Sequence, residues 1–267
     1  MEYQEYSPAR YLSKYIRCYW TVKLKLEDLK TNHFLFPSRG YMDLDFNIKG
    51  TVIRRNNSTE SVCKEGYICG VNTDFIEVDV LSDLEIFGVR FCHGGAFSLF
   101  NTQPSDFTGL NINTGDIPGG DELTNKILEA KNIMERITII ESFIDNNTIH
   151  DNFDERISHS IQIMKATRGS LSIDELARHV NLCQRQFRRR FVSYTGVTPK
   201  SINRIFRFQH ILSAYRLNDK KKLWQVADDC GYVDKSHIIK DFKYFTKKSP
   251  VFFIDQENDI VKKFNKL

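Results

Sequence analysis

Hydrophobic and polar residues alternate over short stretches in the first part of the chain. The alternation is clearest in 42–48, where Met, Leu, Phe and Ile are separated by Asp and Asn, and it returns in 76–80. Two further runs, 34–37 and 86–91, are rich in Phe, Ile, Leu and Val. A period of two is typical of strands with one buried face. These short strands predict an antiparallel sandwich or barrel.

The spacing of the hydrophobic residues changes after residue 95. The run 96–100 predicts a short helix. Between 121 and 146 apolar residues recur three and four apart, which indicates one amphipathic helix or two shorter ones. The apolar face of this helical segment has two interpretations: it joins two copies of the chain, or it packs on its own β domain. We favour packing on the β domain.

A polar stretch, 146–154, separates this segment from a part of the chain in which short helices are predicted throughout. Residues 172–175 (Ser-Ile-Asp-Glu) form a capping box, which marks the start of a helix. A turn at 181–183 leads to a second helix, with Phe187 and Phe191 on its inner side and arginines on its other faces. Two short helices joined by a tight turn, the second one basic, are typical of a helix-turn-helix.

The same pattern returns later in the chain. A helix, a turn and a second helix are predicted over 223–230, 231–234 and 235–243. Phe191 aligns with Phe242, and each repeat ends in a proline, Pro199 or Pro250, that can begin the next helix. Between the repeats, 199–217 is predicted to form one long helix that holds the two units at a fixed separation.

These motifs resemble the AraC/XylS family of transcription regulators. The likeness covers roughly 155–255 and depends on LSIDELARHVNLCQRQFRRRFVSYTGVTP, FQHILSAYRL and LWQVADDCGYVDKSHIIKDFKYFTKKSP. Cys183 replaces the serine that the family usually has, and Lys247 replaces the usual glycine. If residue 247 needs a left-handed backbone, lysine costs about 1 kcal/mol there.

The first part of the chain is similar to the N-terminal domain of a subgroup of these regulators. The segments YSPARYLSKYIRCYW, FPSRGYMDLDF and FGVRFCHGGAF show the similarity, but His93 replaces a proline common in the subgroup. Such domains sense a small molecule or dimerise. The predicted fold is therefore α+β: a β-rich, barrel- or sandwich-like domain over 1–150, and an all-α domain over 151–267 with two helix-turn-helix units joined by a long helix.

The resemblance also assigns residues that contact DNA. Base contacts are expected from Arg185, Arg188 and Arg189 in the first unit, and from Lys235, Ser236, His237 and Lys240 in the second. Phosphate contacts are expected from Gln184, Lys200, Arg204 and Lys243. Arginine can make two hydrogen bonds to guanine in the major groove, whereas the alternative is an ordinary solvated basic face. Since successive major-groove faces lie roughly 34 Å apart, we expect an asymmetric site of about two helical turns.

Charge divides the chain in the same way. Residues 1–150 hold 15 Lys and Arg against 21 Asp and Glu, whereas 151–267 hold 23 against 13. A basic C-terminal domain suggests a polyanion as partner, and composition alone leaves nucleic acid and an anionic membrane surface open. No apolar run is long enough to span a bilayer, and no secretory signal is visible. Six cysteines without a CxxC pair indicate reduced thiols, so we expect a cytoplasmic protein.

No catalytic motif is visible, so we expect no enzymatic activity and no cofactor. We expect no metal site either, because Cys92 and His93 lack further spaced ligands. Arg39 and Arg90 interrupt apolar strands and either bind an acidic ligand or pair with nearby acidic residues. The expected partners are double-stranded promoter DNA, RNA polymerase, a small-molecule effector and a second copy of the chain, but no membrane. The alternatives are a constitutive DNA-binding protein whose first domain only dimerises, and an enzyme targeted to DNA.

Overall fold

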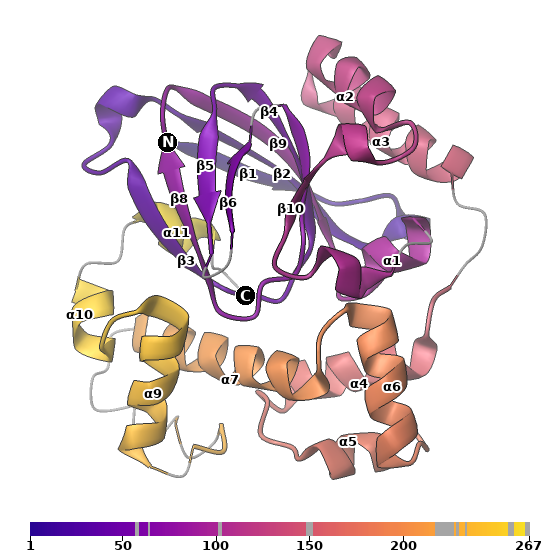
Figure 1. The fold of residues 1–267 in the computed structure, drawn as a ribbon, viewed down its shortest axis with the longest axis vertical. Helices are drawn as coiled ribbons and strands as arrows, with labels where there is room; N and C mark the ends of the chain where they lie inside the picture. The colour runs from indigo at the N-terminus through magenta and orange to yellow at the C-terminus, as the bar shows by residue number, and fades with distance from the viewer. Residues whose placement is uncertain are drawn as a thin grey trace. The chain divides into compact units, whose positions relative to one another are not determined.

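The computed structural model describes residues 1–56, 59–63, 65–100, 103–147, 152–216, 227, 230–232, 234–255 and 259–264. The chain divides into two units (Figure 1). The first unit comprises 1–34, 41–71 and 77–153, and the second unit comprises 35–40, 72–76 and 154–267. None of the helices within these described ranges is long and apolar enough to cross a membrane.

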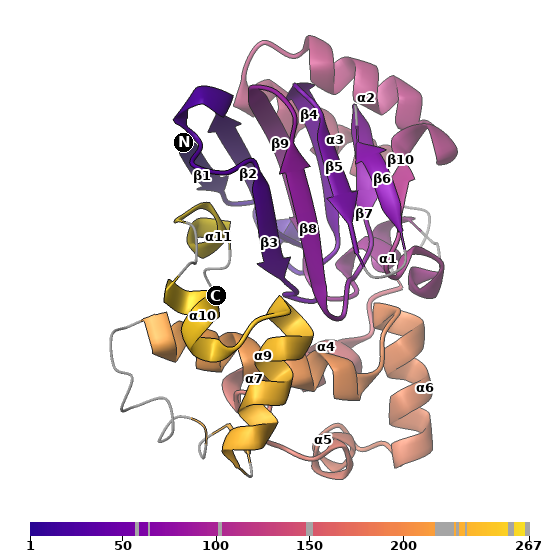
Figure 2. The same cartoon turned by 60° about the vertical axis from the view of Figure 1, so that its left-hand side comes forward.

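The strands form two sheets (Figure 2). They are β1 (Glu2–Tyr6), β2 (Ile16–Leu24), β3 (His33–Pro37), β4 (Asp43–Lys49), β5 (Val52–Arg55), β6 (Glu60–Cys63), β7 (Gly66–Cys69), β8 (Phe75–Val80), β9 (Leu84–Phe91) and β10 (Asn111–Asn113). One sheet has the order β1-β2-β9-β4-β7-β10, with all neighbours antiparallel, and the other has the order β3-β8-β5-β6. The four strands predicted from the sequence are confirmed as β3, β4, β8 and β9, and the predicted short helix is α1 (Gly95–Phe100).

Two helices cover one face of the six-stranded sheet. They are α2 (Gly120–Glu129) and α3 (Ile133–Asn147), so the segment 121–146 forms two helices (Figures 1 and 2). Their apolar residues lie in one core cluster with Leu44, Phe46 and Phe87 of the sheet, and Phe46 stacks on Phe87 with 6.1 Å between ring centroids. The apolar face of this segment is therefore buried on its own sheet.

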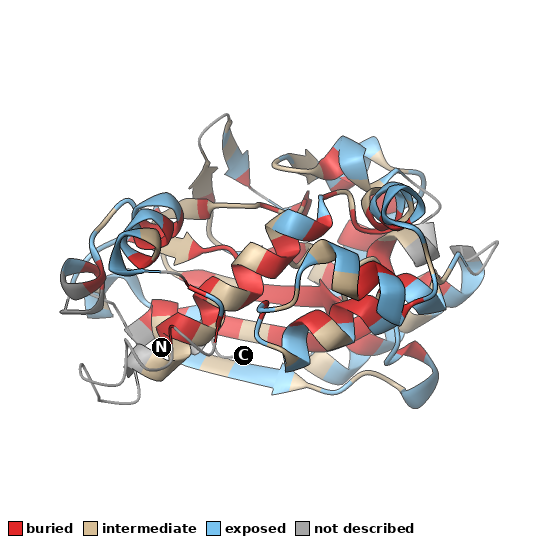
Figure 3. Ribbon diagram, turned by 90° about the horizontal axis from the view of Figure 1, so that it is seen from below, coloured by how far each residue is buried: buried red, intermediate tan, exposed pale blue. Residues whose placement is uncertain are grey.

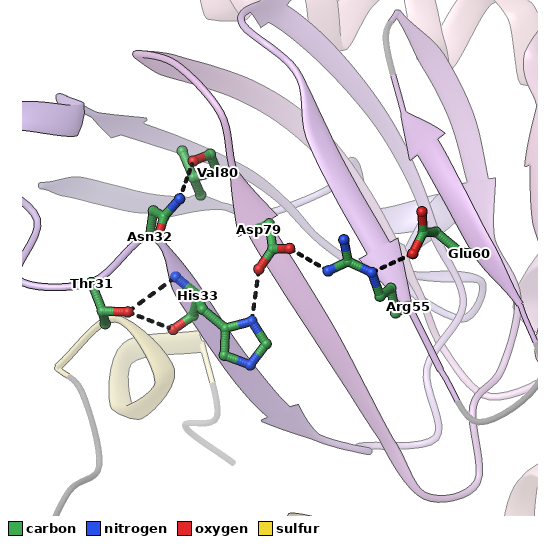
Figure 4. A network of polar contacts seen from close by, with 7 residues as sticks. All are labelled: Thr31, Asn32, His33, Arg55, Glu60, Asp79 and Val80. Atoms are coloured by element: carbon green, nitrogen blue, oxygen red, sulfur yellow. Dashed lines mark hydrogen bonds and ion pairs between the residues drawn. The ribbon is translucent and has the colours of Figure 1, made fainter.

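A row of polar side chains crosses the four-stranded sheet (Figure 4). His33 Nδ1 lies 2.7 Å from Asp79 Oδ1, Arg55 Nη1 donates to the other oxygen of Asp79, and Arg55 Nε donates to Glu60. The row joins β3, β8, β5 and β6 in turn. Hydrogen bonding to Arg55 is the main reason why the pKa of Asp79 is lowered, so this carboxylate stays ionised in the sheet.

The helices of the second unit are short, apart from one. They are α4 (Glu155–Ala166), α5 (Ile173–His179), α6 (Gln184–Thr195), α7 (Pro199–Arg216), α9 (Lys235–Thr246), α10 (Pro250–Asp255) and α11 (Asp259–Phe264). The helices show buried and exposed stripes, as amphipathic spacing requires (Figure 3). The long helix predicted over 199–217 is confirmed as α7. The helix predicted over 223–230 lies outside the described residues, except for Ala227 and Cys230, which are both buried.

The internal repeat is visible at the ends of α6 and α9. Thr195 Oγ1 donates to the carbonyls of Phe191 and Val197, and Thr246 Oγ1 donates to those of Phe242 and Lys248. The next residue has a left-handed backbone in both repeats: Gly196 has φ of 78°, and Lys247 has φ of 58°. The lysine therefore occupies a conformation that favours glycine, the residue usual at this position in the family that the sequence resembles.

Replacing Lys247 should relieve this conformation. We expect Lys247→Gly to raise the free energy of unfolding of the full chain by about 1 kcal/mol, measured by urea denaturation. Lys247→Ala is the control, because it removes the same side chain but keeps a Cβ in the left-handed region, and it should give no gain. Equal effects of the two substitutions would contradict the backbone explanation.

Candidate nucleic-acid interface

The first helix-turn-helix consists of α5 and α6. Ser172 Oγ accepts from the Glu175 amide at 3.3 Å, and the Glu175 carboxylate accepts from the Ser172 amide at 2.8 Å, so the predicted capping box is present. Asn181 has φ of 54°, which makes the sharp turn before α6. The Gln186 side chain accepts from the Cys183 amide at 3.3 Å and helps to fix the start of α6.

The two inner phenylalanines of helix α6 are fully buried, and this orients the helix so that its other faces, which carry the arginines, are exposed. Phe187 and Phe191 meet edge to face with 5.6 Å between ring centroids. The residues that the sequence assigned to DNA contact on this helix are all exposed: Gln184, Arg185, Arg188 and Arg189. Arg190 is held instead by Asp154 at 2.8 Å, which joins α6 to the start of α4. The exposed arginines therefore have their guanidinium groups available for an anionic partner.

Helix α9 repeats this arrangement with different chemistry. Asp234 caps it by accepting from the His237 amide at 2.7 Å. Its predicted contact residues Lys235, Ser236, Lys240 and Lys243 are exposed. His237 is half-buried, and its ring packs against Tyr232 with 4.9 Å between centroids. His237 is thus the least accessible of the side chains predicted for this helix.

Arg204 has a structural contact that sequence reasoning missed. Its Nε and Nη2 atoms both lie 2.8 Å from Asp241 Oδ1, and Tyr232 donates to Asp241 Oδ2 at 2.8 Å. Asp241 is buried on α9, whereas Arg204 lies on α7. Burial and the neighbouring Asp241 raise the pKa of Tyr232, so its hydroxyl remains a donor. A phosphate contact by the half-buried Arg204 stays a prediction, as does one by the exposed Lys200.

Helix α7 contacts both repeats. Asn203 donates to the Leu171 carbonyl at 2.8 Å, beside the first helix-turn-helix. Phe208 stacks on Phe245 with 4.5 Å between centroids and meets Phe242 edge to face at 5.0 Å, beside the second. Because these contacts come from one continuous helix, α7 links the segment before α5 to α9 within the second unit.

The first unit contains a second polar cluster, which is buried in its β structure. Arg90 is fully buried and forms two hydrogen bonds to Asp43, at 3.0 and 2.8 Å, so pairing explains this arginine. Asp45 lies nearby: it accepts from Cys69 Sγ at 3.3 Å and lies 3.6 Å from Arg54 Nη1. Asp45 Oδ1 and Arg54 Nε have no hydrogen-bond partner within the described part of the chain.

Burial makes Asp45 hard to ionise. Loss of water is the largest cause, the Asp43 carboxylate adds to it, and together they raise the pKa of Asp45 to about 7. The Arg54 guanidinium opposes this shift. The cluster can therefore hold a proton inside the sheets under conditions in which an exposed aspartate is ionised. The sequence did not point to it, because Asp45 and Cys69 come from two paired strands and Arg54 comes from the other sheet.

The raised pKa predicts a pH-dependent stability. Because Asp45 binds its proton more tightly when folded, its contribution is present at low pH and is lost as the pH rises from about 4 through about 7. We therefore expect the unfolding free energy of Asp45→Asn, relative to that of the wild type, to increase between pH 5 and pH 8, by at most about 1.4 kcal/mol per pH unit. Urea denaturation at each pH measures this difference. Exposed Asp106→Asn is the control, and a constant difference for Asp45→Asn would contradict the prediction.

Comparison with known proteins agrees with the two-part chain. Residues 4–113 match a family described as a domain of unknown function (DUF6597), and residues 176–256 match a family described as a helix-turn-helix domain. No curated protein matches the chain.

Solved structures show what the fold is similar to. An apo ToxT variant from Vibrio cholerae has 11% identity and a TM-score of 0.51, over 90% of this chain and 98% of that chain. Another ToxT crystal form from Vibrio cholerae has 10% identity and a TM-score of 0.49, over 96% and 98%. The AraC-like transcriptional activator CuxR has 10% identity and a TM-score of 0.29, over 86% and 90%.

The likeness to apo ToxT shows the fold, and the helix-turn-helix match falls on the repeat described above. The predicted α+β fold is confirmed, and the helix-turn-helix match covers most of the stretch that resembles the AraC/XylS family. The chain therefore carries a region that matches DUF6597, followed by a region that matches a helix-turn-helix domain.

Proposed function

We propose that this chain is a transcription regulator that recognises an asymmetric DNA site by placing α6 and α9 in two successive major grooves. The observation that carries the proposal is the exposed basic stripe repeated on α6 and α9, in a unit where α7 bonds the segment before α5 and α9. A helix of this kind fits the major groove, and arginine there selects guanine. The spacing of the two helices then sets the length of the site.

The two recognition helices would contribute differently. Arg185, Arg188 and Arg189 on α6 carry the guanidinium groups that read guanine most selectively. Lys235, Ser236 and Lys240 on α9 discriminate between bases less strongly, so α9 contributes more of its binding energy through phosphates.

The regulatory half of the proposal concerns the first unit. We assign to the first unit either the sensing of a small effector or the pairing of two copies. We assign to the second unit the contacts with DNA and RNA polymerase. The chain would act in the cytoplasm, most simply as an activator. The apolar face of α2 and α3 is already buried on the six-stranded sheet, so pairing would use another surface of the first unit.

Selection from a random pool of double-stranded DNA tests the DNA half of the proposal. The full chain is used at two salt concentrations with excess non-specific competitor. We expect one motif to be enriched across about two helical turns. Binding that falls steeply with salt and enriches no motif would mean that phosphate contacts dominate, which would contradict the proposal.

Removing two arginines from α6 should weaken specific binding. For the double variant Arg188→Ala with Arg189→Ala, we expect a loss of about 2–4 kcal/mol on the selected site and no change in folding, because both side chains are exposed. The matched control removes two exposed arginines from α4 and α5, Arg156→Ala with Arg178→Ala. An unchanged sequence preference in the α6 variant would show that these two arginines do not recognise bases.

Lys243 should behave as a phosphate contact. Lys243→Ala is expected to weaken binding to all sequences by a similar factor and to reduce the slope of log K against log salt by about 0.9. Exposed Lys165→Ala on α4 is the control and should leave the slope unchanged. A loss confined to one sequence would instead make Lys243 a base-reading residue.

A further inference from the structure

Helix α9 exposes one aliphatic residue, Ile239, and one large aromatic residue, Tyr244. Exposed residues recur along one side of the helix, as Lys235, Ser236, Ile239, Lys240 and Lys243. Ile239 is 38% exposed and lies in the middle of this stripe, between the serine and the lysines. The opposite side, with Ile238 and Phe242, is buried. Ile239 therefore lies on the surface that the proposed function turns toward DNA, and outside the hydrophobic core.

The other large apolar side chains exposed on the described helices of the second unit are aromatic rings, and each forms a cation–π contact. The Arg204 guanidinium lies 3.8 Å from the centre of the Tyr244 ring, and Lys248 Nζ lies 5.1 Å from that of Phe252. Both rings thus have a partner inside the second unit. An aliphatic side chain has no ring face to attract a cation, so Ile239 differs from both.

The first repeat has a different residue at this position. Phe191 aligns with Phe242, so Arg188 on α6 corresponds to Ile239 on α9. Isoleucine forms helices less readily than arginine, so helix stability gives no reason for the exchange. What changes is the chemistry of the surface: a side chain with five N–H donors is replaced by one with only methyl and methylene groups.

An apolar side chain in the major groove favours one base. Thymine places its 5-methyl group there, whereas the other bases present hydrogen-bonding edges that an apolar side chain would leave unpaired. We propose that Ile239 is a specificity residue of α9 and packs on the 5-methyl group of a thymine in the second half of the DNA site. The two repeats then read different features: guanine edges through Arg188, and a thymine methyl group through Ile239.

This inference rests on the proposed function, and deoxyuridine tests it directly. Deoxyuridine pairs like thymidine but lacks the 5-methyl group. Each thymine in the α9 half of the selected site is replaced in turn, and the Kd of the full chain is measured for each duplex. We expect about fourfold weaker binding at one position, the effect of one buried methyl group. Ile239→Ala should reduce this penalty to below about twofold, because the isoleucine side chain that packs on the thymine methyl group is then removed.

The control is Lys243→Ala, which should weaken binding overall and keep the full penalty for deoxyuridine. Failure of the proposed function shows first, because the pool would then yield no selected site, and the inference falls with it. If a site is selected but its α9 half has no thymine whose methyl group matters, only the inference is overturned. The same holds if Ile239→Ala keeps the full penalty.

Discussion

The surface proposed to read DNA depends on the contacts between α7 and α9. Arg204 on α7 binds the buried Asp241 of α9, Tyr232 donates to the other oxygen of the same carboxylate, and Phe208 packs on the two inner phenylalanines of α9. A buried carboxylate needs such partners, since an unpaired charge in the interior is strongly destabilising. The ion pair and the aromatic contact together determine the direction in which α9 points.

The two repeats share a backbone design and differ in surface chemistry. Both recognition helices end with a threonine that donates to the same pair of carbonyls and with a residue in the left-handed region. On the surface, α6 carries arginines where α9 carries Ser236, Ile239 and Lys240. A duplicated scaffold with divergent surfaces suits an asymmetric site, because each half is read by its own set of contacts.

Local patterns in the sequence predicted the elements that depend on neighbouring residues. The capping box at Ser172, the left-handed position of Lys247 and the strands with one polar face are properties of a few consecutive residues. Strand β7 escaped prediction because all of its residues are buried, so its sequence does not alternate. Strand β2 was not predicted either, although one of its faces is fully buried and the other mostly is not.

Contacts between distant residues were out of reach of the sequence alone. Asp45 and Cys69 meet through the pairing of β4 with β7, whereas Arg54 reaches Asp45 from the other sheet, and nothing near Asp45 in the sequence indicates this. Arg204 resembled an ordinary surface charge until its contact with Asp241, 37 residues later, was visible. The exposed arginines of α6 were predictable, because the buried Phe187 and Phe191 define the opposite face of that helix.

The proposed reading of an asymmetric site requires that α7 hold the two recognition helices at one separation. Inserting about half a helical turn of DNA at the middle of the selected site tests it most directly, because the insertion moves one half of the site to the opposite side of the duplex. The account predicts that the affinity of the full chain for the lengthened site falls to the level of non-specific DNA. Affinity that survives the insertion would show that α6 and α9 are not held at a fixed separation, and would contradict the claim.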